Sequence, residues 1–338
     1  MTSGSSAPLR HHTPPLVAAQ SPCTLCRGCF FGGSSCSTGV SVRRLDLPTL
    51  GVAVAIYGGF LLWSLNFSAM PLWLAVPLGS VLLAWHGSLQ HETIHGHPTA
   101  SKRLNALIGG VPLSLWIPYA VYRKTHLQHH RHTRQRLTEV GHDPESFYRP
   151  SGHLATVGRI RRALLTANCT LAGRIVLGPL ITVVTFWSQE LRAMRSSRKH
   201  LLIWCRHAIG AAAVLAWTVG VAQVPWYVYV LIVYLSVSLT HVRSFAEHFA
   251  DEHSHSRTNV VEAGPLWALL FLNNNLHIAH HAQPARPWHE LPSVWRQLRP
   301  KLANTGRVFA GGYSEVCRKH LFRPFITPEH PVASTAQR

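Results

Sequence analysis

Charged residues are scarce in this chain, and acidic residues are scarcer than basic ones. Asp, Glu, Lys and Arg make up only 13% of its 338 residues, well below the roughly 25% that is usual for soluble domains. Hydrophobic residues make up 47%. Long stretches carry no charge, and the charged residues gather between them. This segregation argues against a soluble globular protein and indicates a membrane protein.

The few charges are also one-sided, with 32 basic and 13 acidic residues and a formal net charge of +19. A nucleic-acid-binding protein needs its basic residues together on one face of a soluble scaffold. Here they flank apolar segments, where the positive-inside rule and attraction to anionic lipid head groups explain them better. We therefore expect no nucleic-acid partner.

The N-terminal segment lacks any apolar periodicity, and it lacks the pattern of a signal peptide. Gly, Ser and Pro dominate it, so we expect residues 1–42 to be a disordered extension. A start codon placed too far upstream is another possible origin of such a segment. We expect a membrane domain over residues 43–305 and a cytoplasmic tail over residues 306–338.

Four of the seven cysteines fall in this segment. They are Cys23, Cys26, Cys29 and Cys36. Their spacing is one that zinc or an iron–sulfur cluster uses. The composition around them argues against such a site, because no helix or strand pattern accompanies it.

Apolar runs of the right length for a membrane span occur at four places. A helix of about 20 residues crosses a hydrocarbon core of roughly 30 Å. The runs cover residues 47–67, 71–90, 203–222 and 225–242. Short uncharged connections join the first to the second and the third to the fourth, so we expect two helical hairpins. The predicted fold class is an all-α integral membrane protein.

Shorter apolar stretches are interrupted by Gly and Pro, and we expect them to lie in the interface or against the bundle. They cover residues 104–122, 174–188 and 264–276. Lys and Arg are concentrated between the second and third spans, beginning at Lys102 and Arg103. By the positive-inside rule, this segment and both termini face the cytoplasm.

Histidine is abundant, with 24 residues, and the patterned groups lie at or just beyond the apolar runs. Residues 91–97 read HETIHGH, residues 126–132 read HLQHHRH, and residues 277–281 read HIAHH. Positions i, i+3 and i+4 share a helix face, so we expect the imidazoles of each group to point at one place. His248, beyond the last span, lies on the same predicted side. The predicted metal ligands are His91, His95, His126, His129, His130, His248, His277, His280 and His281.

This many imidazoles indicates two metal ions, because one ion rarely takes more than six ligands. Imidazole suits iron, zinc, copper and nickel, so donor type alone does not choose among them. Nearby carboxylates are candidates for orienting the rings through their other nitrogen. These candidates are Glu92, Asp143, Glu247, Asp251 and Glu290. Among Asn273, Asn274 and Asn275, which precede the last box, one is a candidate for holding a metal-bound water, and helix capping and backbone hydrogen bonding are the alternatives.

Other conspicuous side chains receive simpler interpretations. We rank His97 and His132 below the metal ligands, because an i+2 position points to another helix face. We expect His86 to be packed or to line a substrate path. Interfacial or surface positions are expected for His241, His253, His255 and His289. Interface anchoring is favoured over lining a substrate path for Trp116, Tyr119, Tyr122, Trp267 and Phe271.

The three histidine groups resemble the histidine boxes of the integral-membrane fatty acid desaturases and of related hydroxylases and ketolases. Similar segments are RSFAEH at 243–248, DPES at 143–146, NNNLHIAHH at 273–281 and PWHELP at 287–292. The resemblance covers roughly residues 45–300. It implies a cap of cytoplasmic helices over four spans, two Fe²⁺ ions held by the histidines named above, and O2 as co-substrate.

The resemblance favours a fatty acid desaturase that introduces a double bond into an acyl lipid. It implies a bacterial inner-membrane protein with its active site on the cytoplasmic side. The chain carries no fused heme domain or ferredoxin motif, so a separate electron donor such as a ferredoxin is expected. The sequence leaves the oligomeric state open.

Two alternatives to a desaturase remain. The first box is HxxxH, whereas many acyl desaturases have HxxxxH, which leaves open a hydroxylase or ketolase acting on an alkane, an acyl lipid or a carotenoid. A histidine-rich metal transporter is more remote, because transport sites lie near the membrane midplane and these histidines lie at span ends.

Overall fold

The computed structural model describes residues 45–132, 136–251, 257–302 and 305–331. These residues belong to one compact unit, Arg43–Arg338. The predicted disorder of residues 1–42, the four cysteines of that segment, His253 and His255 all lie outside the described residues. The division of the unit at residue 305 stays a prediction.

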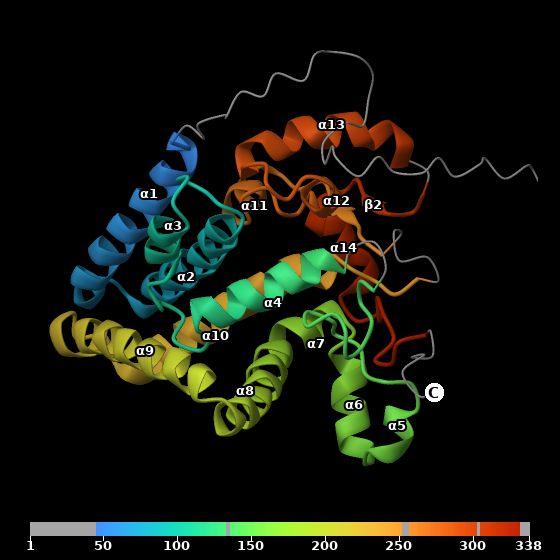
Figure 1. Ribbon diagram of the computed structural model, residues 1–338, viewed down its shortest axis with the longest axis horizontal. Helices are drawn as coiled ribbons and strands as arrows, with labels where there is room; N and C mark the ends of the chain where they lie inside the picture. The colour runs from blue at the N-terminus through green and yellow to red at the C-terminus, as the bar shows by residue number, and fades with distance from the viewer. Residues whose placement is uncertain (1–44, 133–135, 252–256, 303–304, 332–338) are drawn as a thin grey trace, which may run out of the picture. The chain divides into compact units, whose positions relative to one another are not determined.

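The described part of this unit is helical, with one small parallel pairing of two strands (Figure 1). Its elements in chain order are α1 (Leu47–Leu65), η1 (Phe67–Ala69), α2 (Leu72–Ile94), α3 (Lys102–Gly109), α4 (Tyr119–Arg131), α5 (His153–Thr156), α6 (Arg159–Ala167), α7 (Leu171–Val176), α8 (Gly178–Ser196), α9 (Arg198–Leu215), η2 (Ala216–Val221), α10 (Trp226–Phe245), β1 (Val260–Val261), α11 (Pro265–Leu270), α12 (His277–Ala282), η4 (Trp288–Glu290), α13 (Leu291–Leu302), β2 (Val308–Phe309) and α14 (Gly312–His320).

Four helical segments are long and apolar enough to cross a membrane, as predicted. They are Leu47–Leu65, Leu72–Ile94, Arg198–Val221 and Trp226–Phe245. The second span, α2, continues four residues past the predicted end at residue 90, so the first histidine group begins inside the helix. The shorter apolar stretches contribute to α3, α4, α8 and α11. The pairing into hairpins and the side facing the cytoplasm stay predictions.

The core of the bundle forms where α1, α2 and α10 pack together. Trp63 of α1 is buried there, and its indole N–H donates to the carbonyl of Ala75 in α2 at 2.8 Å. Gly79 permits the close approach, because a Cβ at this position would lie 2.8 Å from the Trp63 ring and 3.1 Å from Ile232 of α10. This packing fixes the relative position of the ends of α2 and α10, from which histidines emerge.

The remaining histidines are brought to the same region by α4 and α12. Pro118 is the N-cap of α4, which suits the fixed φ of proline at a helix start. The turn before α12 is tied to β1 by Asn275, whose amide donates to the carbonyl of Val261 at 2.8 Å. β1 in turn pairs with β2, with Val260 opposite Val308. The start of helix α12 is therefore held in place by hydrogen bonds to β1, which is itself paired with β2.

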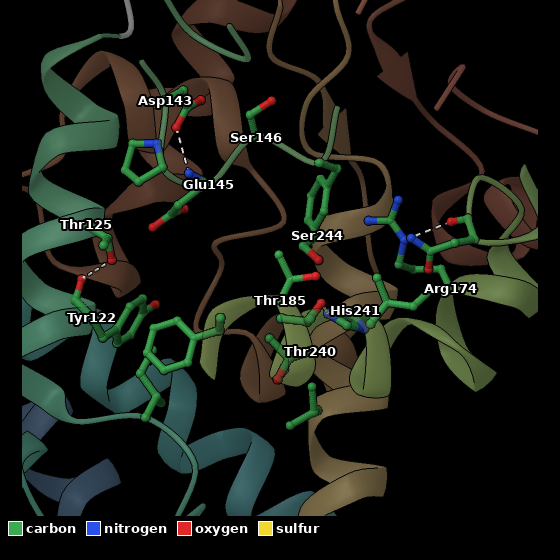
Figure 2. A pocket seen from close by; sticks show the side chains of 18 of the residues that line it. Tyr122, Thr125, Asp143, Glu145, Ser146, Arg174, Thr185, Thr240, His241 and Ser244 are labelled. Carbon is green, nitrogen blue, oxygen red and sulfur yellow. Dashed lines mark hydrogen bonds between the residues drawn. The ribbon is translucent and has the colours of Figure 1, made fainter. Parts of the chain in front are cut away.

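A cavity of about 590 Å³ lies beside this region. Figure 2 shows Tyr122 and Thr125 of α4 on one side of it and Thr240 and Ser244 of α10 among the residues facing them. The segment from Val140 to Arg149 and residues of α2, α7 and α8 also contribute to the lining. The volume is within the range of about 300–1,000 Å³ that is usual for small-molecule sites.

The close contact at Gly79 makes a prediction about stability. Gly79→Ala places a methyl group against Trp63 and Ile232, so we expect it to lower the free energy of unfolding by about 1–3 kcal/mol. Gly58→Ala is the matched control in α1, where a Cβ meets no atom within 4 Å; there we expect a small gain, because alanine is the better helix former. Thermal unfolding of the two variants in detergent, followed by tryptophan fluorescence, measures the difference. Equal midpoints for the two variants would contradict this packing.

Candidate metal centre

The structure gathers the predicted histidines into two adjoining groups. The first group is His91, His95, His126, His130 and His280, and the second is His129, His248, His277 and His281. Within each group, one ring nitrogen from every residue lies within 4.8 Å of those of all the others. The groups meet where the rings of His130 and His281 stack with centroids 4.5 Å apart.

The expectation that each histidine box points at one place is confirmed for His91 and His95 but is wrong for the other two boxes. In α4, His126 and His130 join the first group while His129 joins the second. In α12 the pattern is reversed, because His277 and His281 join the second group and His280 joins the first. The reason is helical geometry: at about 100° per residue, positions i+3 and i+4 diverge by about 100° around the helix. The second and third boxes therefore contribute to both groups, whereas His91 and His95 of the first box both belong to the first group.

The Nε2 atoms within each group lie unusually close together. In the first group, His130 Nε2 is 3.1 Å from His126 Nε2 and 3.0 Å from His280 Nε2. In the second group, His277 Nε2 is 2.9 Å from His248 Nε2 and 3.1 Å from His281 Nε2. The inner edges of rings from four different segments thus converge on two small volumes.

The outer nitrogens of several rings are held by oxygen atoms. The Nδ1–H of His126 donates to Glu145 at 2.9 Å, and that of His129 donates to Asp143 at 2.9 Å. The Nδ1–H of His248 donates to the carbonyl of Arg257 at 3.1 Å, and that of His277 donates to the side-chain oxygen of Asn274 at 3.0 Å. We assign these tautomers because the partners accept hydrogen bonds. In each ring the Nε2 lone pair then points into the centre.

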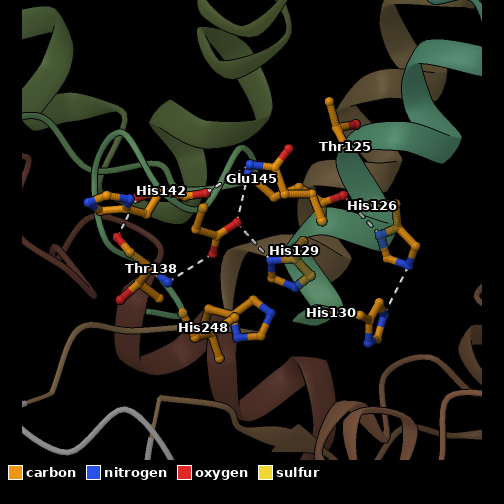
Figure 3. Close-up of polar contacts among 12 residues, drawn as sticks. Thr125, His126, His129, His130, Thr138, His142, Glu145 and His248 are labelled. Atoms are coloured by element: carbon orange, nitrogen blue, oxygen red, sulfur yellow. Dashed lines mark hydrogen bonds and ion pairs between the residues drawn. The ribbon is translucent and has the colours of Figure 1, made fainter. Parts of the chain in front are cut away.

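A tight turn positions the two carboxylates that hold α4 (Figure 3). The Asp143 side chain accepts hydrogen bonds from the backbone N–H of Thr138 at 2.8 Å and of Glu145 at 2.9 Å. These bonds leave Asp143 facing His129 and Glu145 facing His126. The turn orients the two rings, which belong to different groups.

Burial sets the charge of most of these rings. It lowers the pKa of His248 to about 3, with repulsion from a positive charge at His129 adding to the effect. Burial and neighbouring imidazoles also lower the pKa values of His95, His130, His277, His280 and His281. These rings are therefore neutral near pH 7, which is the form that binds metal ions.

His129 differs from the other rings. Burial acts to lower its pKa, but Glu145 and Asp143 outweigh burial and raise the pKa to about 9. In turn, the pKa of Glu145 is lowered, because attraction to His126 and His129 outweighs its own burial. The ring of His129 and the two carboxylates thus form a cluster of opposite charges on the α4 side of the second group.

The other predicted outer residues differ in what they contact. The Glu247 carboxylate lies 3.4 Å from His277 Nδ1, and Glu92 lies 3.6 Å from His91 Nδ1 while accepting the backbone N–H of Trp288 at 3.0 Å. Asn273 and Asn275 bond to backbone carbonyls. The Glu290 side chain forms an exposed ion pair with Arg286 at 2.7 Å.

Sequence reasoning missed two partners and misplaced several side chains. Glu145 was not predicted as a partner, although it stands two residues after Asp143, and the carbonyl of Arg257 carries no signal in the sequence. His241 was expected at an interfacial or surface position but is 5% exposed and lines the cavity, because it lies on the inner face of α10. Trp116, Tyr122 and Phe271 also line the cavity, contrary to the preference for interface anchoring.

The sequence model of the fatty acid desaturase family matches residues 49–312. The chain belongs to this family. Comparison with curated protein sequences gives no significant match. The matched residues include all three histidine boxes, three candidate spans and all but the first two residues of the fourth, Leu47–Leu65. Membership of the desaturase family identifies the protein as an oxidoreductase, and the four apolar helices indicate that it is a membrane protein.

Proposed function

We propose that the two histidine groups hold two iron ions and that the protein is an O2-dependent desaturase acting on the acyl chain of a lipid. In this proposal the first ion is bound by His91, His95, His126, His130 and His280. The second is bound by His129, His248, His277 and His281. The family match supports the chemistry, and the geometry of the rings supports the assignment of ligands.

The strongest support for a bound metal ion is one short distance: His248 Nε2 lies 2.9 Å from His277 Nε2. Both rings are neutral near pH 7, because burial lowers their pKa values. Both also use their Nδ1–H in hydrogen bonds to oxygen. Two lone pairs therefore face each other, and they repel unless a cation lies between them.

The spacing of the donors also fits metal binding. A metal ion with nitrogen ligands at about 2.1 Å separates ligands at right angles by about 3.0 Å. Nε2 separations of 2.9–3.1 Å in the two groups match that value. Oxygen atoms on the outer nitrogens are the usual supports of metal-binding histidines, and they fix the direction of each ring.

Bound iron would activate O2 with two electrons from a separate donor, which is chemistry that no side chain supplies. The overall reaction converts –CH2–CH2–, O2, two electrons and two protons into –CH=CH– and two water molecules. The protein residues orient the rings, keep water away and position the substrate. Tyr122 stands at the junction, since it lines the cavity and its ring centroid is 5.7 Å from that of His126.

The proposal extends to the electron donor and to the side of the membrane that the site faces. The site lies at the ends of α2 and α10, so we propose that it faces the cytoplasm of a bacterium from the inner membrane. Electrons would come from a ferredoxin-type donor, whose acidic surface would be attracted to this basic chain. The substrate would reach the cavity from the lipid phase.

His129→Ala tests the ligand assignment. We expect the wild-type protein to retain two iron ions per chain and the variant to lose the ion of the second group, because His129 is one of its four ligands. Mass spectrometry of the purified proteins measures the metal content. His132→Ala is the control, since His132 caps the same helix but belongs to neither group. Equal iron in all three proteins would contradict the assignment.

Glu145→Gln tests the support given to His126. The amide keeps the size of the side chain but removes the negative charge, so we expect iron affinity to fall about 10- to 100-fold. Competition with a chelator measures the affinity. Glu290→Gln, which alters an exposed ion pair with Arg286, should leave affinity unchanged. An unchanged affinity in Glu145→Gln would show that this hydrogen bond does not tune the site.

Product analysis tests the reaction. We expect expression in a bacterial host to yield lipids that have lost two hydrogen atoms, measured by mass spectrometry of the lipid extract. The His129→Ala strain should show none of them. Products that have gained an oxygen atom instead would identify a hydroxylase or ketolase and contradict the desaturase.

A further inference from the structure

The cavity beside the histidines is lined by cationic residues as well as by the carboxylates that contact the histidines. Arg174 of α7 lines the cavity and is 2% exposed. Figure 2 shows it on the opposite side of the pocket from Tyr122 and Glu145. Arg149, at the end of the segment that carries Asp143 and Glu145, lines the cavity as well.

Both arginines have unused hydrogen-bonding capacity. The Nε–H of Arg174 donates to the carbonyl of Asn168 at 2.9 Å, and its guanidinium lies 4.1 Å from the centre of the Phe147 ring. Its Nη1 is buried without a hydrogen-bond partner, and so is the Nε of Arg149. Two donors on cationic residues that line the cavity are thus unsatisfied.

The carboxylates of the cavity do not compensate this charge. In the described part of the chain, Asp143 and Glu145 pair with His129 and His126, and Glu190 pairs with His200 at 2.6 Å. The neighbouring groups whose negative form would stabilise the charge of Arg174 are Cys169 and Tyr148. Burial raises the pKa values of both, that of Tyr148 to about 12, so both are neutral at pH 7.

Arg174 nevertheless remains charged. Burial lowers its pKa only to about 10, so it is protonated at neutral pH. A buried cation without a counter-ion is strongly destabilising. Arg174 thus resembles a ligand-binding group more than a structural one, since a structural arginine at this depth is normally paired.

The part of the cavity between Tyr122 and Arg174 is lined by both polar and apolar side chains. Hydroxyl groups of Thr185, Thr240 and Ser244 lie among the residues between Tyr122 and Arg174 in Figure 2. Apolar residues such as Ile181 and Phe186 also contribute. This mixture suits a ligand that has both a chain and a polar end.

We propose that the cavity binds its substrate by an anionic head group, a carboxylate or a phosphate, held by Arg174 and Arg149. The chain extends from there toward Tyr122 and the histidines. The substrate is then a free acid or a phosphate monoester rather than a neutral ester. This inference rests on the proposed function only in taking the cavity to be the substrate site.

The test measures binding, so it does not depend on turnover. Wild-type protein in neutral detergent is titrated calorimetrically with hexadecanoate, hexadecyl phosphate and methyl hexadecanoate at pH 8. We expect at least one anionic ligand to bind about tenfold or more tightly than the ester, as a charge-assisted hydrogen bond implies. The stronger of the two anions identifies the head group. Equal affinity for the ester and both anions would overturn the proposal.

Two variants locate the effect. Arg174→Gln should abolish the preference for the anion, and Arg149→Gln, at a less buried position, should reduce it. Arg192→Gln, on the exposed face of α8, is the control and should leave the preference intact. A preference that survives in both cavity variants would overturn the proposal. Iron content, measured in parallel, reports separately on the proposed function and on folding.

Discussion

The centre depends on hydrogen bonds at the outer nitrogens of its imidazoles. Because Asp143, Glu145, Asn274 and the carbonyl of Arg257 accept the Nδ1–H groups, the Nε2 lone pairs turn inward. Burial keeps His248 and His277 neutral, so their facing lone pairs repel each other. Their 2.9 Å approach supports the proposal that a cation lies between them. The fold supplies this constraint by fixing the ends of α2, α4, α10 and α12.

Much of this could be predicted from the sequence, because two of its signals are physically direct. Spans follow from apolar runs long enough to cross a bilayer, and four of them were found where expected. The histidines at i, i+3 and i+4 follow from helical periodicity. Helical periodicity does not predict how one helix is oriented relative to another. His129 and His280 therefore went to the opposite group from their helix neighbours, a result of how α4 and α12 face each other.

Other parts of the site arise only from tertiary contacts. Glu145 reaches His126 because the turn at Asp143 directs it there, and no spacing rule predicts that contact. The burial of His241 and Arg174 depends on packing of α7, α8 and α10. The same packing creates a cavity that is lined by Asp143 and Glu145, the partners of His129 and His126, and also by Arg174. In the proposals made above, chemistry and recognition of the substrate's head group use different parts of this cavity.

The most direct measurement of the central claim is X-ray absorption at the iron edge on purified wild-type protein. The account predicts two iron ions per chain, with first-sphere nitrogen ligands at about 2.0–2.2 Å whose outer-shell scattering is typical of imidazole. Protein that binds no iron when it is supplied, or iron ligated by sulfur, would contradict the account.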